Sequence, residues 1–211
     1  MAIERTEVTT VLEVDLGMRN RLTAFFRLLL VIPAAILLSL LTNGGSGFSN
    51  SASNTDGSGH WGMSGGMVPT AGIALLLLFV GTYPTWLLSF VHAIQSFSTR
   101  VAAYALLLRD EYPNINERPY AAVVYPDIAE GATLSRALPI VKWLLAIPHY
   151  LLLLVTAPAV GLVTFMAWLA ILFTGRYPAG LASFVVWYVS YANRVYGYAF
   201  ALVTDSYPRV A

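Results

Sequence analysis

Long apolar runs alternate with short polar and turn-rich segments along this chain. Leu22–Leu41 is apolar for about 20 residues, enough for a helix to cross the roughly 30 Å of hydrocarbon in a bilayer. Leu138–Thr156 and Ala159–Thr174 are two further runs with a weak break between them. We expect all three to be transmembrane helices. The last two should form a helical hairpin with its tip at Thr156–Gly161.

The first run is followed by a low-complexity segment and a shorter apolar run. Thr42–Pro69 is rich in Gly, Ser and Asn, and carries one acid and no Lys or Arg, which predicts a flexible loop. Thr70–Gly81 is long enough to span only if its helix begins earlier, near Met63, or if the bilayer thins around it. With Leu22–Leu41 it would complete a first hairpin.

Two segments place polar residues on one face of an otherwise apolar helix. Thr85–Leu108 and Gly180–Val203 both carry such a polar stripe, with members three or four residues apart. The stripe residues that recur at corresponding positions are Ser89, Ser96 and Arg100 in the first segment and Ser183, Ser190 and Arg194 in the second. Repetition within one sequence indicates that the stripe belongs to the repeated unit and is not a chance arrangement.

Short β-branched segments precede each set of apolar runs. Thr6–Val14 and Tyr120–Tyr125 are typical of strands, and both stand ahead of basic residues and a membrane helix. We expect them to pair in a small sheet outside the membrane.

The whole pattern occurs twice. Arg27 opens one apolar run and Gly81-Thr82-Tyr83-Pro84 ends the hairpin; Lys142 and Gly175-Arg176-Tyr177-Pro178 repeat that frame. We therefore expect an all-α integral membrane protein of two tandem repeats, each a transmembrane helical hairpin plus an amphipathic interfacial helix, with a short strand before each repeat. The expected divisions are an N-terminal strand segment 1–18, repeat one 19–113 with its loop 42–69, a linker with a strand 114–133, and repeat two 134–211.

Composition agrees with a membrane protein. The 211 residues are 57% hydrophobic and 11% charged, whereas soluble domains average about 25% charged residues. The net charge of +1 without a long cationic run argues against nucleic acid as a partner. The absence of cysteine excludes disulfides, thiolate metal sites and cysteine nucleophiles.

Charge placement predicts a topology. Lys and Arg are missing from the two expected hairpin tips and present in the other connections, which puts the tips outside and both termini in the cytoplasm. This holds if the striped helices lie at the interface. In the alternative of six crossings, Arg100 and Arg194 fall near mid-bilayer, at a cost of at least about 2.5 kcal/mol each.

Three segments carry a family resemblance. They are Lys142–Tyr150 (KWLLAIPHY), Phe173–Leu181 (FTGRYPAGL) and Thr204–Pro208 (TDSYP). Together they resemble the bacterial membrane family called domain of unknown function 4389, in two tandem copies of which the first is the weaker match. The resemblance implies a small multi-pass protein of the bacterial cytoplasmic membrane, and it supplies no catalytic residue.

Candidate site residues are ionisable or hydroxyl groups in apolar surroundings, a usual sign of function in membrane helices. They are Arg27, Arg100, Lys142, Arg194, Ser89, Ser96, Ser183 and Ser190, as contacts to lipid or a partner. Structural roles compete: Arg27 and Lys142 can snorkel to the interface, and Arg100 and Arg194 can pair with Asp110, Asp205 or lipid phosphate. His149, after Pro148, is expected to bond a backbone carbonyl that the proline leaves without its partner.

No catalytic, cofactor or metal site is predicted. The three histidines, His60, His92 and His149, are far apart, and no G-x-S-x-G sequence occurs. We expect a non-enzymatic accessory or structural subunit whose partners are the bilayer and other membrane subunits or a second copy. The alternative is lipid binding or transport by the Arg100 and Arg194 stripes, and the least favoured is a hydrolase built on Ser64 and His60.

Overall fold

The computed structural model describes residues 7–15, 17–19, 21–43, 67–113, 121–129, 134–135 and 138–210. The described elements are, in chain order, β1 (Thr9–Leu12), α1 (Arg21–Asn43), α2 (Met67–Phe79), α3 (Thr85–Ala105), β2 (Ala121–Val124), α4 (Leu138–Leu145), α5 (Ile147–Thr174) and α6 (Ala179–Ala199).

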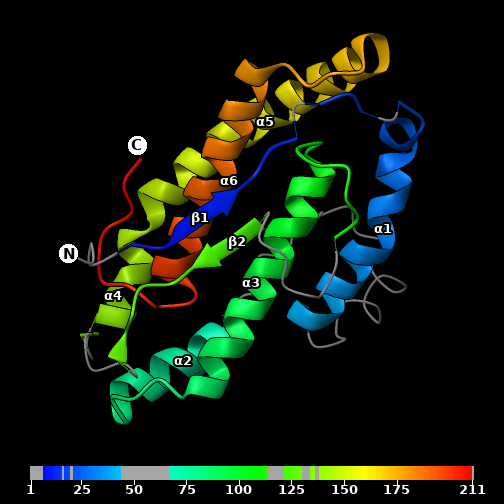
Figure 1. Cartoon of the computed structure of the whole chain (residues 1–211). Coiled ribbons are helices and arrows are strands. Elements are labelled where there is room, and N and C mark those ends of the chain that lie inside the picture. The colour runs from blue at the N-terminus through cyan, green and yellow to red at the C-terminus, as the bar shows by residue number, and fades with distance from the viewer. Residues whose placement is uncertain are drawn as a thin grey trace, which may run out of the picture.

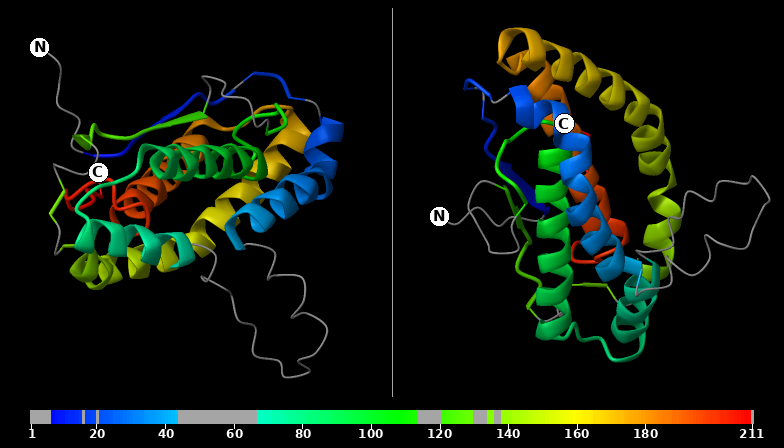
Figure 2. Two further views of the ribbon diagram at one scale, coloured as in Figure 1. Left: turned by 90° about the horizontal axis from the view of Figure 1, so that it is seen from below. Right: turned by 90° about the vertical axis from the view of Figure 1, so that its right-hand side faces the viewer.

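These elements form three layers (Figure 1; Figure 2, left). The two-stranded sheet is one outer layer, α3 and α6 are the middle layer, and α1, α2, α4 and α5 are the other outer layer, called here the apolar layer. Buried residues of the sheet side and of the apolar layer meet on α3 and α6, so the core lies around the middle layer.

The predicted strands are confirmed. β1 pairs antiparallel with β2, with Thr9 opposite Val124 and Leu12 opposite Ala121. β1 packs against α6 and β2 against α3. Each strand therefore covers a helix from the other half of the chain.

Both predicted hairpins are wrong, and α5 shows the clearest difference. It is one continuous helix of 28 residues, about 42 Å long, and it runs through the expected tip Thr156–Gly161. Pro158 removes a single backbone donor, and the Thr156 hydroxyl donates to the Leu152 carbonyl of the same helix at 2.7 Å. No residue at this point favours a reversal strongly enough to end the helix.

The first hairpin is absent for a different reason. α1 packs against α3 and α5, whereas α2 packs against α4 from the other half of the chain. Most of the expected loop Thr42–Pro69 lies outside the described residues, although its first and last few residues belong to α1 and α2.

Helix α1 bends within its apolar run. The parts Arg21–Arg27 and Leu29–Thr42 meet at 47°. The bend falls about one turn before Pro33, where the proline removes the hydrogen bond to the carbonyl of residue 29.

Among the described residues, α5 has the length and composition to cross a membrane, and the bent α1 is a second candidate if its two parts form one span. The striped helices α3 and α6 do not meet that test. They lie alongside α1 and α5, between the apolar layer and the sheet (Figure 2).

Candidate functional site

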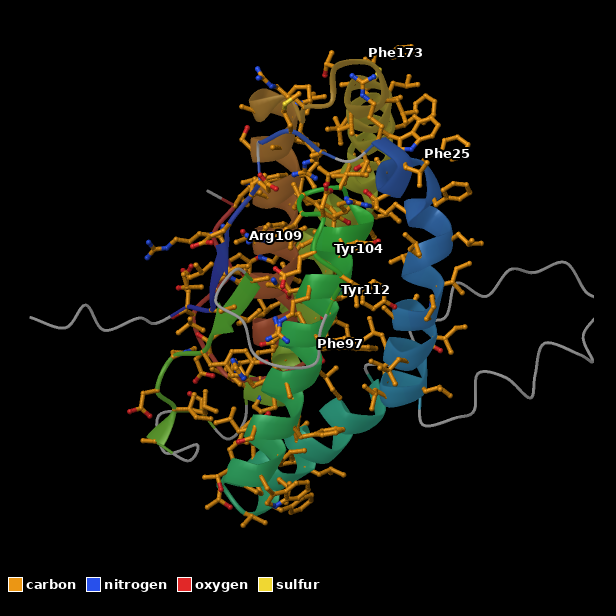
Figure 3. The ribbon with its side chains drawn as sticks, turned by 45° about the vertical axis from the view of Figure 1, so that its right-hand side comes forward. Phe25, Phe97, Tyr104, Arg109, Tyr112 and Phe173 are labelled. Atoms are coloured by element: carbon orange, nitrogen blue, oxygen red, sulfur yellow. The ribbon has the colours of Figure 1, made fainter. Side chains whose placement is uncertain are left out.

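A buried ion-pair cluster joins α1 to the segment after α3. Arg27 is 2% exposed, and its Nη2 contacts the carboxylate of Asp110. Arg19 approaches the same carboxylate at 3.4 Å. The Arg27 guanidinium lies 4.6 Å from the ring centre of Tyr104, against which Tyr112 packs edge-on at 5.6 Å (Figure 3). The cation is thus held by charge and by an aromatic face.

A second cluster has the same parts. Lys142 of α4 is fully buried, with its Nζ 2.6 Å from Asp205 and donating to the Thr204 carbonyl at 2.7 Å. The Nζ lies 5.5 Å from the ring centre of Tyr198, and Tyr207 meets that ring edge-on at 5.9 Å. Cation, acid and two tyrosines therefore recur in both halves.

Two tyrosines connect the halves reciprocally. Tyr83, which follows α2, donates its hydroxyl to the Ala201 carbonyl at 3.1 Å. Tyr177, which follows α5, donates to the Leu106 carbonyl at 3.5 Å. Each accepting residue directly precedes a leucine with positive φ, at Leu107 (φ 63°) and Leu202 (φ 55°). Each half thus completes the helix end of the other.

The second half carries a polar group that the first half lacks. The hydroxyl of Tyr191 on α6 contacts Nδ1 of His149, whose ring lies 4.5 Å from that of Tyr207. Ala34 and Phe97 occupy the corresponding places in the first half and form an apolar contact with Val101. The histidine thus meets a tyrosine hydroxyl, where the expectation was a backbone carbonyl.

A buried hydrogen-bond network fills the crossing of α3 and α6 under the sheet. Gln95 donates to the Asn193 carbonyl at 3.1 Å, and the Thr99 hydroxyl donates to the Asn193 side chain at 3.2 Å. Tyr125 donates to the Gln95 side chain, and Asn193 donates to the Thr10 hydroxyl at 3.1 Å. This network therefore joins the middle layer to the sheet.

The snorkelling expected for Arg27 and Lys142 is wrong. Both cations point inward and pair with Asp110 and Asp205, because these acids arrive from loops more than 60 residues away in sequence. The sequence contained a signal for this pairing: an Asp stands two residues before a Tyr-Pro in both halves, matching the recurrence of the cation.

The other predicted site residues do not form one cluster. Arg100 is 3% exposed, Arg194 is half-buried and donates to the Arg209 carbonyl at 3.0 Å, and Ser96 is buried. Ser89 and Ser183 are exposed, and Ser190 is half-buried. Ser64 and His60 lie outside the described residues.

The electrostatics of the second cluster favour an ionised acid. Burial alone would raise the pKa of Asp205, but the Lys142 ammonium and the Ser135 amide, which donates at 2.8 Å, lower that pKa overall. The carboxylate therefore stays charged beside Lys142.

These features define a mostly helical protein with a small two-stranded sheet and one apolar helix of membrane length, or two with α1. Residues 139–210 match the family model described as Domain of unknown function (DUF4389) and form a DUF4389 domain. The domain contains the Lys142 cluster and His149; the Arg27 cluster precedes it. No curated protein matches the chain, and no solved structure does.

Proposed function

We propose that this chain is a non-enzymatic integral protein of the bacterial cytoplasmic membrane, inserted by its apolar layer into one leaflet and serving as an accessory or structural subunit. The exposure of α5 carries the proposal. Its buried residues are His149, Val160, Ala167 and Ile171, while its remaining side chains are half-buried or exposed. An apolar helix of this length with so little cover suits lipid.

Helix α1 adds to the same face. Large apolar side chains on α1 and α5 reach exposures above half, namely Leu22 69%, Phe25 56%, Leu29 65%, Leu151 58%, Leu154 70%, Val155 73%, Leu162 65%, Phe165 54%, Met166 55% and Phe173 78%. Phe25 and Phe173 lie on the outside of their helices (Figure 3). The face they form exceeds scattered surface hydrophobics and needs an apolar medium.

The acidic residues are segregated away from the apolar layer. None of the helices α1 to α6 contains Asp or Glu. The acids that the structure describes lie in the strands' flanks and in the segments that follow α3, β2 and α6, at Glu7, Glu13, Asp15, Asp110, Glu111, Asp127 and Asp205. Water on the sheet side and lipid on the apolar layer fit this division.

Insertion into one leaflet fits the layers better than crossing does. Because α6 runs alongside α5 and β1 packs on α6, a crossing α5 would carry the open sheet to bilayer depth. Unpaired strand edges in hydrocarbon cost several kcal/mol for each polar group. The exposed Glu13 carboxylate beside β1 would add a further cost. With the layers parallel to the membrane, both costs disappear.

We also propose that the chain is a tandem repeat, whose second copy is the DUF4389 domain. The recurring ion-pair clusters, the reciprocal Tyr83 and Tyr177 bonds and the antiparallel strand pair support it. Such contacts are those of a two-fold arrangement with its axis through the three layers. In the one-leaflet arrangement both copies then meet the membrane in the same way.

An accessory role is supported by how the ionisable residues are used. Arg27 and Lys142 are engaged inside the fold, which gives them a structural purpose. Purification in a mild detergent should recover a partner subunit or a homo-oligomer. A lone monomer would contradict this part of the proposal.

A second candidate, suggested by the polar stripes in the sequence, is lipid binding by Arg100 and Arg194. This candidate has less support, because Arg100 is 3% exposed and the half-buried Arg194 donates to the Arg209 carbonyl. Replacing both by leucine should remove bound anionic lipid measured by mass spectrometry. Unchanged lipid content would refute it.

Cysteine labelling tests the one-leaflet arrangement, because the native chain has no cysteine. Ser135→Cys and Arg176→Cys place reporters at exposed positions before α4 and after α5. In sealed vesicles, an impermeant maleimide should label both from the same side. Labelling from opposite sides would show that α5 crosses and would contradict insertion into one leaflet.

A further inference from the structure

A cavity of about 290 Å³ lies between the start of α1, the end of α3 and the middle of α5. Its lining residues are Ala24, Arg27, Ala105, Leu107, Gly161, Thr164, Phe165 and Trp168. All of them are apolar except Arg27 and Thr164. The cavity lies within the apolar layer and against the middle layer, so its floor is protein and its α1 and α5 walls belong to the lipid-facing side.

Aromatic rings fix the walls of this cavity. Trp168 donates its indole N–H to the Ala24 carbonyl at 3.1 Å, which ties α5 to α1. Phe165 and Phe25 stack on Trp168, with ring centres 5.9 Å and 6.3 Å away. Both phenylalanines are more than half exposed. The space between the helices is thus held open on the exposed side of the layer.

Two polar atoms on the cavity residues lack a hydrogen-bond partner among the described residues. They are Nε of Arg27 and Oγ1 of Thr164, and both are buried. Buried polar groups are nearly always satisfied, and an orphaned pair at one cavity needs an explanation. Acceptor oxygens of a bound molecule are one such explanation for this N–H and this O–H.

The local charge favours an anionic acceptor. The Arg27 guanidinium contacts the carboxylate of Asp110 through Nη2, while its Nε has no partner among the described residues. The carboxylate of Asp15 is exposed and accepts from the Gly17 amide. A carboxylate or phosphate oxygen is therefore favoured over a neutral acceptor next to Arg27.

We propose that this cavity binds a single acyl chain, with the acidic or ester head of the molecule at Arg27 and Thr164 and the chain along Phe165 and Trp168. The shared chemistry fits a free fatty acid or one chain of a phospholipid. The route of entry rests on the proposed membrane insertion, but binding to purified protein does not.

Gly161 provides a variant that fills the cavity. A Cβ at Gly161 meets no atom within 4 Å and Gly161 lines the cavity, so Gly161→Leu is chosen to fill it. Gly180→Leu is the matched control, because its Cβ is equally unobstructed and it does not line the cavity. Thr164→Val keeps the side-chain shape and removes the hydroxyl.

The experiment is photocrosslinking of purified protein in one detergent, with a diazirine fatty acid in one arm and a diazirine-acyl phospholipid in the other. We expect labelling of α1 and α5 at the cavity, reduced about tenfold by Gly161→Leu and unchanged by Gly180→Leu. Thr164→Val should weaken displacement by oleate several-fold and leave displacement by a hydrocarbon unchanged. The probe that labels the cavity, fatty acid or phospholipid, shows which kind of molecule supplies the bound acyl chain.

Labelling spread over the exposed faces, or undiminished in Gly161→Leu, would overturn the proposal. Membrane fractionation of the same variants is a separate measurement. If the protein fractionates with membranes but is not labelled at the cavity, the proposed binding site is refuted and the proposed membrane location is not.

Discussion

At the scale of single residues, the stability of the fold depends on two buried cations, each of which needs a carboxylate beside it. Removing one partner of a buried pair leaves an uncompensated charge, which costs more than the pair itself contributes. Arg27 and Lys142 are both in this position. Their acids therefore act as anchors between the helices and the loops that follow α3 and α6.

Asp205→Asn should lower the free energy of unfolding by about 3–5 kcal/mol, because Lys142 would stay buried without its carboxylate. Glu13→Gln is the control, since Glu13 is 67% exposed and its 3.7 Å contact with Arg109 lies at the surface. It should change stability by less than about 1 kcal/mol. Denaturation in the same detergent measures both, and equal losses would refute an anchoring role.

The same pair predicts how stability depends on pH. The pKa of Asp205 is lower in the folded protein than its ordinary value of 3.8. Its stabilising contribution is thus present above pH 3.8 and is lost as the pH falls through the folded-state pKa. Thermal unfolding between pH 6 and pH 3 should show a steeper loss for the native chain than for Asp205→Asn, and parallel curves would contradict this.

At the scale of elements, the residues just before β1 pack directly against the backbone of α6 at Gly197. A Cβ at Gly197 would lie 2.4 Å from Cγ2 of Val8, which is 2% exposed. The backbone of α6 can be this close to the strand segment only because residue 197 has no side chain.

Gly197→Ala should therefore destabilise the protein by about 1–3 kcal/mol through overpacking against Val8. Gly180→Ala, where a Cβ meets nothing, should be neutral or gain up to about 1 kcal/mol of helix propensity. Unfolding midpoints of the two variants compare them directly. A stabilising Gly197→Ala would show that the segment before β1 does not pack on α6.

Local pattern predicted some elements well and their connections poorly. Both strands, the starts of α3 and α6 after Tyr-Pro, and the bend before Pro33 follow from short-range rules. The continuity of α5 through Pro158 does not, because a proline inside an apolar run is compatible with a kink, a turn or a straight helix. Surrounding packing decides among them.

The candidate site shows the same limit. The sequence identified Arg27 and Lys142 as unusual, but their acids lie more than 60 positions away, and proximity in sequence favoured Arg100 and Arg194 instead. The cavity between α1 and α5 depends on the loss of the hairpin, so no sequence pattern indicated it. Which residues far apart in the sequence pair with each other depends on the topology of the fold, and local sequence patterns do not give that topology.

At the scale of the whole molecule, the three layers predict which face holds the membrane. Leu154→Lys changes a 70% exposed residue of the apolar layer, and Val11→Lys changes a 44% exposed residue of the sheet. Leu154→Lys should lower the fraction retained in membranes after alkaline extraction, since a lysine in hydrocarbon costs at least about 2.5 kcal/mol. Val11→Lys should be retained like the native chain, and equal retention would contradict the assigned face.

The crossed bonds of Tyr83 and Tyr177 have a consequence for synthesis on the ribosome. The Leu106 carbonyl at the end of α3 accepts from the Tyr177 hydroxyl, which is synthesised about 70 residues later, and β1 can pair only after β2 has been made. Neither half can make all of its contacts before the other has emerged, so these bonds can form only late in synthesis.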